Sequence, residues 1–172
     1  MLRPAILYQE ILTKLYTTLW FQEKYKFYLS GWSCDNLELK KTTWDKHEFV
    51  SVDKDGNVLG FIDYWVDRCS NKATGLCAVS FTEKPTVTFG RDLYQVIDDI
   101  FCKFNFNKLR FGVIIGNPIE TTYDKLIAKY GGTICGYMKE EIKLFDGKLY
   151  DLKNYEIMRE DYMQCKKDMN KQ

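Results

Sequence analysis

Apolar residues recur every three or four positions in three stretches, and this period predicts amphipathic helices. The first stretch runs from Leu2 to Trp20, the second from Gly90 to Phe104 and the third from Pro118 to Tyr130. The expected buried faces are Tyr8, Ile11, Leu12, Leu15 and Leu19 in the first; Leu93, Val96, Ile97, Ile100, Phe101 and Phe104 in the second; and Ile119, Thr122, Tyr123, Leu126, Ile127 and Tyr130 in the third.

Runs of β-branched and aromatic residues between turn signals predict strands. The expected strands are His47 to Val52, Val58 to Cys69, Gly75 to Glu83, Lys108 to Gly116, Thr133 to Phe145 and Lys148 to Met158. Asp55-Gly56 and Asp146-Gly147 are hairpin turn signals between consecutive strands. Residues 21–45 are rich in aromatic side chains and give no clear period; one interpretation is a second helix through Tyr28 followed by a loop around Gly31.

The order of these elements is an antiparallel meander, then helix, strand and helix, then a terminal hairpin. Helix and strand alternate only in the middle of the chain, which favours an α/β (α+β) fold with a mixed, mostly antiparallel sheet flanked by helices. No linker, repeat or low-complexity segment interrupts residues 1–172, so we expect a single domain.

Composition narrows the class of protein. The net charge of +1 provides no basic surface for nucleic acid or an anionic membrane. Glu10 and Lys14 fall inside the first helical pattern and argue against a signal peptide. The six cysteines include no Cys-x-x-Cys pair, so we expect reduced, mostly buried thiols in a cytoplasmic protein and no metal site.

Residues 108–132 carry the strongest local signals. A buried strand meets Asn117-Pro118, where Asn117 is a candidate N-cap and Pro118 suits the first turn of a helix. Gly131-Gly132 offers the left-handed exit that ends such a helix.

This order of elements resembles the GNAT-type N-acyltransferases, which use acetyl-CoA. The resemblance covers roughly residues 47–160. Tyr123-Asp124-Lys125-Leu126 is similar to the second half of that family's "Asn, small residue, Tyr-Glu-Lys-Leu" helix, and the segment from Asp146 to Asp161 is similar to the last hairpin of the branch that acetylates protein N-termini and polyamines. The resemblance implies a sheet that is splayed between its fourth and fifth strands, where the strand from Gly75 to Glu83 separates from the strand from Lys108 to Gly116.

The resemblance also implies roles for individual residues. Tyr123 would be the general acid for the departing thiolate. Glu83, at the end of the strand before the pyrophosphate loop, is a candidate general base, and Asp63, within a strand, is a similar candidate. The alternatives are a core tyrosine and an exposed carboxylate at a strand end. The acetyl-CoA contacts would be Val79, Ser80 and Phe81 for the pantetheine arm, then Thr88, Phe89, Gly90, Arg91 and Asp92 around the pyrophosphate, with Asn117 at the start of the later helix.

This chain departs from the family pattern at three places. Of the glycine-rich pyrophosphate loop only Gly90 remains, with Arg91 as a compensating charge; the alternative is a plain helix start capped by Thr88. The spacing from Asn117 to Tyr123 is one residue short, which offers Gly116 for the family's Asn position. No strand is predicted before the first helix, so the family's first strand is absent or is supplied by Leu37 to Lys41.

The expected function is transfer of an acetyl group to a primary amine of a small molecule or a protein N-terminus, with a homodimer as one option for assembly. The alternatives are a catalytically inactive module of the same fold and a structural subunit that pairs through its first helix. An aromatic cluster offers a substrate pocket or a packed lid; its members are Trp20, Phe21, Tyr25, Phe27, Tyr28 and Trp32.

Overall fold

The computed structural model describes residues 1–19, 22–28, 37–169 and 171. Its helices are η1 (Ala5–Tyr8), α1 (Gln9–Leu19), η2 (Glu23–Tyr28), α2 (Val87–Cys102), α3 (Glu120–Lys129) and α4 (Arg159–Met169), where η denotes a 3₁₀ helix. Its strands are β1 (Leu2–Pro4), β2 (Lys46–Val52), β3 (Val58–Asp67), β4 (Lys72–Ser80), β5 (Lys108–Ile114), β6 (Thr133–Lys143) and β7 (Leu149–Met158).

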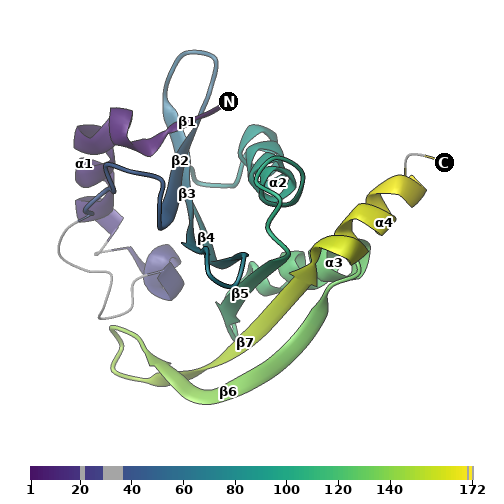
Figure 1. The fold of residues 1–172 in the computed structure, drawn as a ribbon. Helices are drawn as coiled ribbons and strands as arrows, with labels where there is room; N and C mark the ends of the chain where they lie inside the picture. Colours follow the sequence, from purple (N-terminus) through teal and green to yellow (C-terminus); the bar gives the residue numbers. More distant parts are fainter. Residues whose placement is uncertain (20–21, 29–36, 170, 172) are drawn as a thin grey trace.

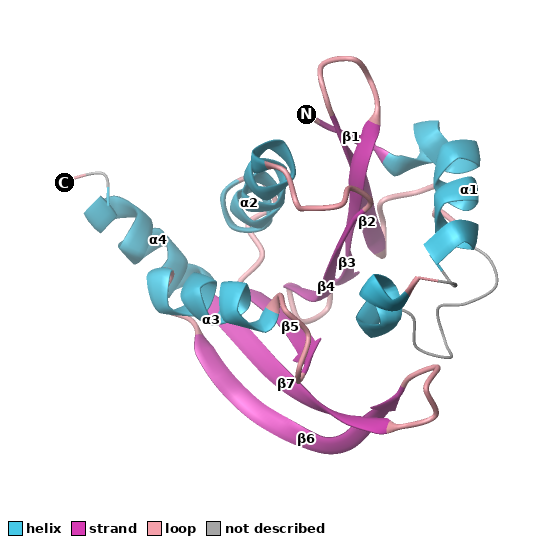
Figure 2. Cartoon of the chain, turned by 180° about the vertical axis from the view of Figure 1, so that it is seen from behind, coloured by secondary structure: helices cyan, strands magenta, loops and turns pink. Residues whose placement is uncertain are grey.

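The strands form one sheet in the order β1-β2-β3-β4-β5-β7-β6. Every neighbouring pair is antiparallel except β4 and β5, which are parallel. Helices α2, α3 and α4 lie on one face, and α1 and η2 lie on the other (Figure 1). The same arrangement is seen from behind in Figure 2. The mixed, mostly antiparallel sheet expected from the sequence is therefore confirmed.

The larger core cluster lies under α2, α3 and α4. Tyr162 of α4 stacks on Phe101 of α2, with ring centroids 4.6 Å apart, and on Tyr130 at the end of α3, at 4.8 Å. A smaller cluster, which includes Leu12 and Phe61, lies under α1. Burial of such aromatic rings stabilises the fold by the hydrophobic effect, and it fixes the helices against the sheet.

The prediction for the first 20 residues is partly wrong. Leu2–Pro4 forms strand β1, which pairs with β2, and the α-helix begins only at Gln9. Residues 37–41 are neither helix nor strand, so they do not supply a first strand. A three-residue strand is too short to show a period. On the helix, Leu12 and Leu19 are buried as expected, whereas Ile11 is 48% exposed.

Other boundaries also differ. β4 begins at Lys72, because the expected start at Gly75 is a bulge inside the strand, and α2 begins at Val87, three residues before Gly90. Helix α4 was not predicted, since Tyr162 is its only buried residue. The region through Tyr28 is a 3₁₀ helix, and residues 29–36, including the expected loop around Gly31, lie outside the described residues.

The expectation of mostly buried thiols is wrong for the five described cysteines, all of which are free: Cys69, Cys102 and Cys135 are exposed, and Cys77 and Cys165 are half-buried. Each exposed thiol lies where the packing ends, in a turn, at a helix end and on an edge strand. Among the described residues, no helix is both long enough and apolar enough to span a membrane.

Candidate active site

Strands β4 and β5 pair at one end and part at the other. Register contacts join Lys72, Ala73 and Thr74 only to Lys108, Leu109 and Arg110. Beyond these residues lies an open cavity of about 630 Å³, which we call the V cavity. Its lining residues are Phe27, Tyr28, Trp65, Gly75, Leu76, Cys77, Ala78, Gly112, Val113, Ile114, Asn117, Ile119, Tyr123, Ile142 and Leu152. The predicted splay between these two strands is confirmed.

A β-bulge marks the point where the strands part. The register between β3 and β4 shifts between Asp63 and Trp65, opposite Gly75. Gly75 has a φ of +65°, in the left-handed region that glycine enters without a steric penalty. Because a bulge bends its strand and increases the local twist, β4 turns away from β5 after Thr74.

Tyr123 projects from α3 into the V cavity and is only 4% exposed. Its ring meets Phe111 edge to face, with centroids 5.0 Å apart. Burial raises the pKa of Tyr123 well above its usual range, and nearby Cys77, Tyr28 and Tyr155 add to the shift. Within the described part of the chain no hydrogen-bond partner for its hydroxyl is found. The site therefore holds a protonated phenol that is free to donate to a ligand.

A buried lysine ties α3 to the sheet. Lys153 of β7 lies 2.7 Å from Asp124 Oδ1 and 3.2 Å from Glu120 Oε1, and the Tyr155 hydroxyl donates to Asp124 at 2.8 Å. These carboxylates raise the pKa of Lys153 above its usual range, with the hydrogen bond to Asp124 as the main cause. The sequence analysis missed this network. Its signal was a lysine inside an apolar strand together with two acids spaced i, i+4 on a helix.

Asn117 lines the V cavity and orders the turn into α3. Its Oδ1 accepts a hydrogen bond from the Ile119 N–H at 3.1 Å, and its carbonyl accepts one from Glu120 at 2.9 Å. The helix begins at Glu120, so Asn117 caps a preceding turn and not the helix itself. Gly116 has a φ of +94°, and Gly131 at the far end has a φ of +67°, as the predicted left-handed exit requires.

The end of β4 is not paired with β5, although Val79, Ser80 and Phe81 are not among the residues that line the V cavity. The Phe81 N–H donates to the Leu59 carbonyl of β3 at 2.9 Å. Because successive residues of a strand direct their backbone groups to opposite sides, the N–H groups of Ser80 and Ala78 face away from β3 and toward the gap. Val79 is buried. The Ser80 hydroxyl lies 3.0 Å from that of Thr82 and so closes the following turn.

Helix α2 begins with few free donors. Thr86 caps it, since its hydroxyl accepts from the Phe89 N–H at 3.1 Å, and the Gly90 N–H donates to the Thr86 carbonyl at 3.0 Å. The cap is thus Thr86 and not Thr88. No described residue accepts from the N–H groups of Val87 and Thr88, which are the donors left at this helix N-terminus.

The neighbours of Gly90 serve different purposes. Phe89 is buried and packs against Gly60, where an added Cβ would lie 2.3 Å from the Phe89 ring. Asp92 is buried too: it accepts a hydrogen bond from the Ser51 hydroxyl at 2.7 Å and lies 2.8 Å from the amino group of Met1. Arg91 is exposed on the first turns of the helix. Of these side chains only that of Arg91 is available to an anion.

Neither candidate base is among the residues that line the V cavity. The Glu83 carboxylate is 95% exposed, with Lys24 at 3.5 Å. Asp63 is buried beside Lys46, whose Nζ lies 2.5 Å from Asp63 Oδ2 and 3.0 Å from Glu48 Oε1. Burial raises the pKa of Asp63, although Lys46 opposes the shift. Asp63 is the cross-strand neighbour of Cys77, which lines the cavity.

Two members of the aromatic cluster line the V cavity. They are Phe27 and Tyr28 of η2, whereas Tyr25 is buried. Phe27 also meets Tyr150 of β7, with ring centroids 6.1 Å apart, and so links η2 to the terminal hairpin. Trp20, Phe21 and Trp32 lie outside the described residues. Over residues 1–19, 22–28, 37–169 and 171, no three His, Cys, Asp or Glu side chains are grouped as metal ligands would be.

No protein-family model and no curated protein sequence matches this chain. The chain is, however, similar to solved structures. The spermidine N-acetyltransferase from Vibrio cholerae in complex with CoA and spermine aligns over 95% of this chain and 97% of its own, with a TM-score of 0.73 and 18% identity. The spermidine/spermine N-acetyltransferase SpeG from Vibrio cholerae in complex with manganese ions aligns over 71% and 70%, with a TM-score of 0.60 and 22% identity.

These neighbours are members of the GNAT superfamily, and the chain has the GNAT fold. At such low identity the likeness concerns the fold alone.

Proposed function

We propose that this protein is an N-acetyltransferase that uses acetyl-CoA and transfers the acetyl group to a primary amine of a small molecule or a protein N-terminus. The observation that carries the proposal is the free hydroxyl of Tyr123 in a cavity between two parted strands. The structural neighbour in complex with CoA and spermine supports the choice of acyl donor and of an amine acceptor.

The residues present fit acetyl-CoA in part. The unpaired edge of β4 at Ala78 and Ser80 offers backbone groups to the pantetheine arm, as it would to an added strand. The N–H groups of Val87 and Thr88 offer two donors to the pyrophosphate, with Arg91 nearby for charge. Two donors are fewer than an intact glycine-rich loop presents. We therefore expect binding in the low-micromolar to submillimolar range.

In this proposal Tyr123 acts through a hydrogen bond. A phenol whose pKa is held so high keeps its proton at neutral pH. It would donate a hydrogen bond to the sulfur as negative charge develops there, which stabilises the transition state. The base is Glu83, directly or through a water, and Asp63 is the alternative because it is the cross-strand neighbour of a cavity residue. Phe27 and Tyr28 would exclude water from the acceptor side.

A specific observation favours a second candidate, an inactive module of the same fold. The Gly90 N–H is bonded within the helix, and the side chains of Phe89 and Asp92 are engaged elsewhere, so the predicted pyrophosphate cradle is reduced. Such a protein would keep the splayed sheet without binding acetyl-CoA. The homodimer and the cytoplasmic location stay predictions.

Turnover with a panel of amines distinguishes the two candidates. Purified protein would be incubated with acetyl-CoA and spermidine, spermine or a short peptide with a free N-terminus, and CoA release would be followed by chromatography. Chromatography is preferable to a thiol reagent because three of the described cysteines are exposed. Amine-dependent release of CoA supports the enzyme. No release, together with no rise in melting temperature at millimolar acetyl-CoA, supports the inactive module.

A further inference from the structure

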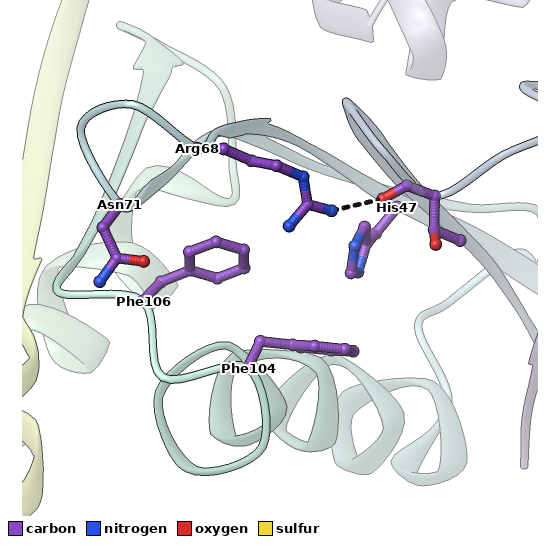
Figure 3. A pocket seen from close by; sticks show the side chains of 6 residues that line it. His47, Arg68, Asn71, Phe104 and Phe106 are labelled. Carbon is purple, nitrogen blue, oxygen red and sulfur yellow. Dashed lines mark hydrogen bonds between the residues drawn. The ribbon is translucent and has the colours of Figure 1, made fainter.

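A second cavity, of about 230 Å³, lies at the end where β4 and β5 are paired. We call it the paired-end pocket. Its lining residues are Thr43, His47, Arg68, Asn71, Phe104 and Phe106 (Figure 3). They come from the segment before β2 and the start of that strand, the turn between β3 and β4, and the loop between α2 and β5. None of them lines the V cavity, so two ligands would not compete for the same residues.

Arg68 is held in place at the rim of the paired-end pocket. Its Nε donates to the Trp44 carbonyl at 2.7 Å, its Nη2 donates to the Thr43 carbonyl at 3.1 Å, and its guanidinium lies 4.4 Å from the centre of the Trp44 ring. A guanidinium has five N–H donors, so three stay available, including the parallel pair on its Nη1–Nη2 edge. That edge matches the two oxygens of a carboxylate.

Three of the six lining residues carry aromatic rings: His47, Phe104 and Phe106. Phe106 and His47 are each only 4% exposed, and the His47 ring meets Phe104 edge to face at 4.6 Å. His47 Nδ1 is hydrogen-bonded to the Tyr64 hydroxyl at 2.7 Å, which fixes the ring. Burial lowers the pKa of His47, so the ring is neutral at pH 7. Arg68 is then the one charged side chain among the described lining residues.

We propose that the paired-end pocket binds a small aromatic carboxylate, with the carboxylate on Arg68 and the ring against Phe104, Phe106 and His47. The volume of the paired-end pocket is large enough for a benzene ring, because a cavity of about 150 Å³ holds benzene. The remaining volume accommodates a carboxylate beside the ring. A cationic ligand is disfavoured by Arg68, and an aliphatic anion would make no ring contact with Phe104. This site does not depend on the proposed acetyl transfer.

Benzoate is the probe for the experiment. A titration followed by amide chemical shifts should give saturable changes at residues 43–47, 68–71 and 104–106, with a dissociation constant of about 1 mM or tighter. Acetate lacks the ring and benzyl alcohol lacks the charge, so each should bind at least about tenfold more weakly than benzoate. Acetate binding as tightly as benzoate would overturn the proposal, as would the absence of saturable shifts with benzoate.

Two variants complete the test. Arg68→Gln removes the charge from an exposed side chain and should weaken benzoate binding about tenfold or more with an unchanged melting temperature. Arg110→Gln removes another exposed arginine outside the pocket and should leave the affinity unchanged. If Arg68→Gln lowers the melting temperature, Phe104→Leu tests the ring contact and should weaken benzoate more than acetate. Equal benzoate affinity in wild type and in both pocket variants would contradict the proposal.

Discussion

The two ends of the β4–β5 pair differ in how their polar groups are satisfied. At the paired end the Asn107 N–H donates to the Asn71 carbonyl at 2.8 Å, and the Arg159 N–H donates to the Asn107 carbonyl at 2.8 Å. At the open end the Tyr123 hydroxyl has no partner among the described residues, and one edge of β4 faces a cavity. The same two strands thus stabilise the sheet at one end and offer unsatisfied groups to a ligand at the other.

The bulge at Gly75 separates these two ends. Before the bulge, the backbone groups of β4 that face β5 are hydrogen-bonded to that strand. After the bulge, the groups on this edge of β4 are not paired with β5. Buried polar groups without partners are costly, so a fold tolerates them mainly where a ligand or water satisfies them. The comparison shows that strand pairing ends where the V cavity begins, and the proposed acetyl transfer would take place there.

The largest effect is expected for Tyr123→Phe, which removes the free hydroxyl from the open end. Turnover should fall by about 10²- to 10⁴-fold, while acetyl-CoA affinity and melting temperature change little. The hydroxyl has no partner to lose among the described residues, so packing is preserved. Steady-state kinetics with any accepted amine provide the measurement. Equal turnover in the variant and wild type would exclude Tyr123 from the mechanism.

The next largest effect is expected at Gly60, which lies beside the open end of β4. An alanine Cβ there would lie 2.3 Å from the Phe89 ring and 2.6 Å from the Val79 carbonyl. Gly60→Ala should therefore lower the free energy of unfolding by about 1–3 kcal/mol. Gly90→Ala is the matched control: its Cβ would meet no atom within 4 Å, and in a helix it should stabilise by about 0.5–1 kcal/mol. Urea denaturation would measure the free energy of unfolding of both variants. Equal values for Gly60→Ala and Gly90→Ala would contradict the close contact between Gly60 and the Phe89 ring.

Gly75 tests the bulge itself. Gly75→Ala places a side chain at a φ of +65° and should cost roughly 1–2 kcal/mol, whereas Gly75→Asn should cost less because asparagine tolerates this region. The new Cβ would lie 3.4 Å from Trp65, an ordinary contact, so the effect would report backbone strain. Thermal unfolding is the measurement. An asparagine variant less stable than the alanine variant would argue against a conformational origin.

The smallest effect concerns the thiol in the V cavity. Burial raises the pKa of Cys77 to about 12, so the thiol is protonated at pH 8. Alkylation of Cys77 by iodoacetamide should be slow at pH 8 and accelerate as the pH rises toward 12, because the thiolate is the nucleophile. Exposed Cys135 serves as the internal comparison. Peptide mass spectrometry would resolve the two rates, and Cys77 modified as fast as Cys135 would contradict the raised pKa of the Cys77 thiol.

Local sequence patterns predicted where the strands lie along the chain better than they predicted the contacts between helices and strands. β2, β6 and β7 begin within one residue of expectation, because each carries strong strand residues beside a clear turn. Gly75 was mistaken for a strand start, since a bulge glycine and a turn glycine give the same signal. α4 has a single buried residue and therefore no apolar period.

In the candidate site, too, single residues were predicted better than the contacts between them. Tyr123 was singled out through a family resemblance, and the structure puts it in the cavity. The bonds from Lys153 to Asp124 and Glu120 were not foreseen, because they join residues 29 and 33 positions apart and depend on how α3 lies on β7. The capping of α2 by Thr86 also escaped prediction, since Thr86 and Thr88 both precede an apolar period.

The most direct test of the account is hydrogen–deuterium exchange with and without acetyl-CoA. Peptides that cover residues 75–80 and the start of α2 at 87–90 should exchange more slowly with the ligand, because the free edge of β4 and the N–H groups of Val87 and Thr88 would become bonded. Peptides that cover residues 68–74 and 104–110 should not change. Unchanged exchange over 75–80 at saturating acetyl-CoA, or protection confined to the paired end, would contradict the claim that the open end of the V is the acyl-donor site.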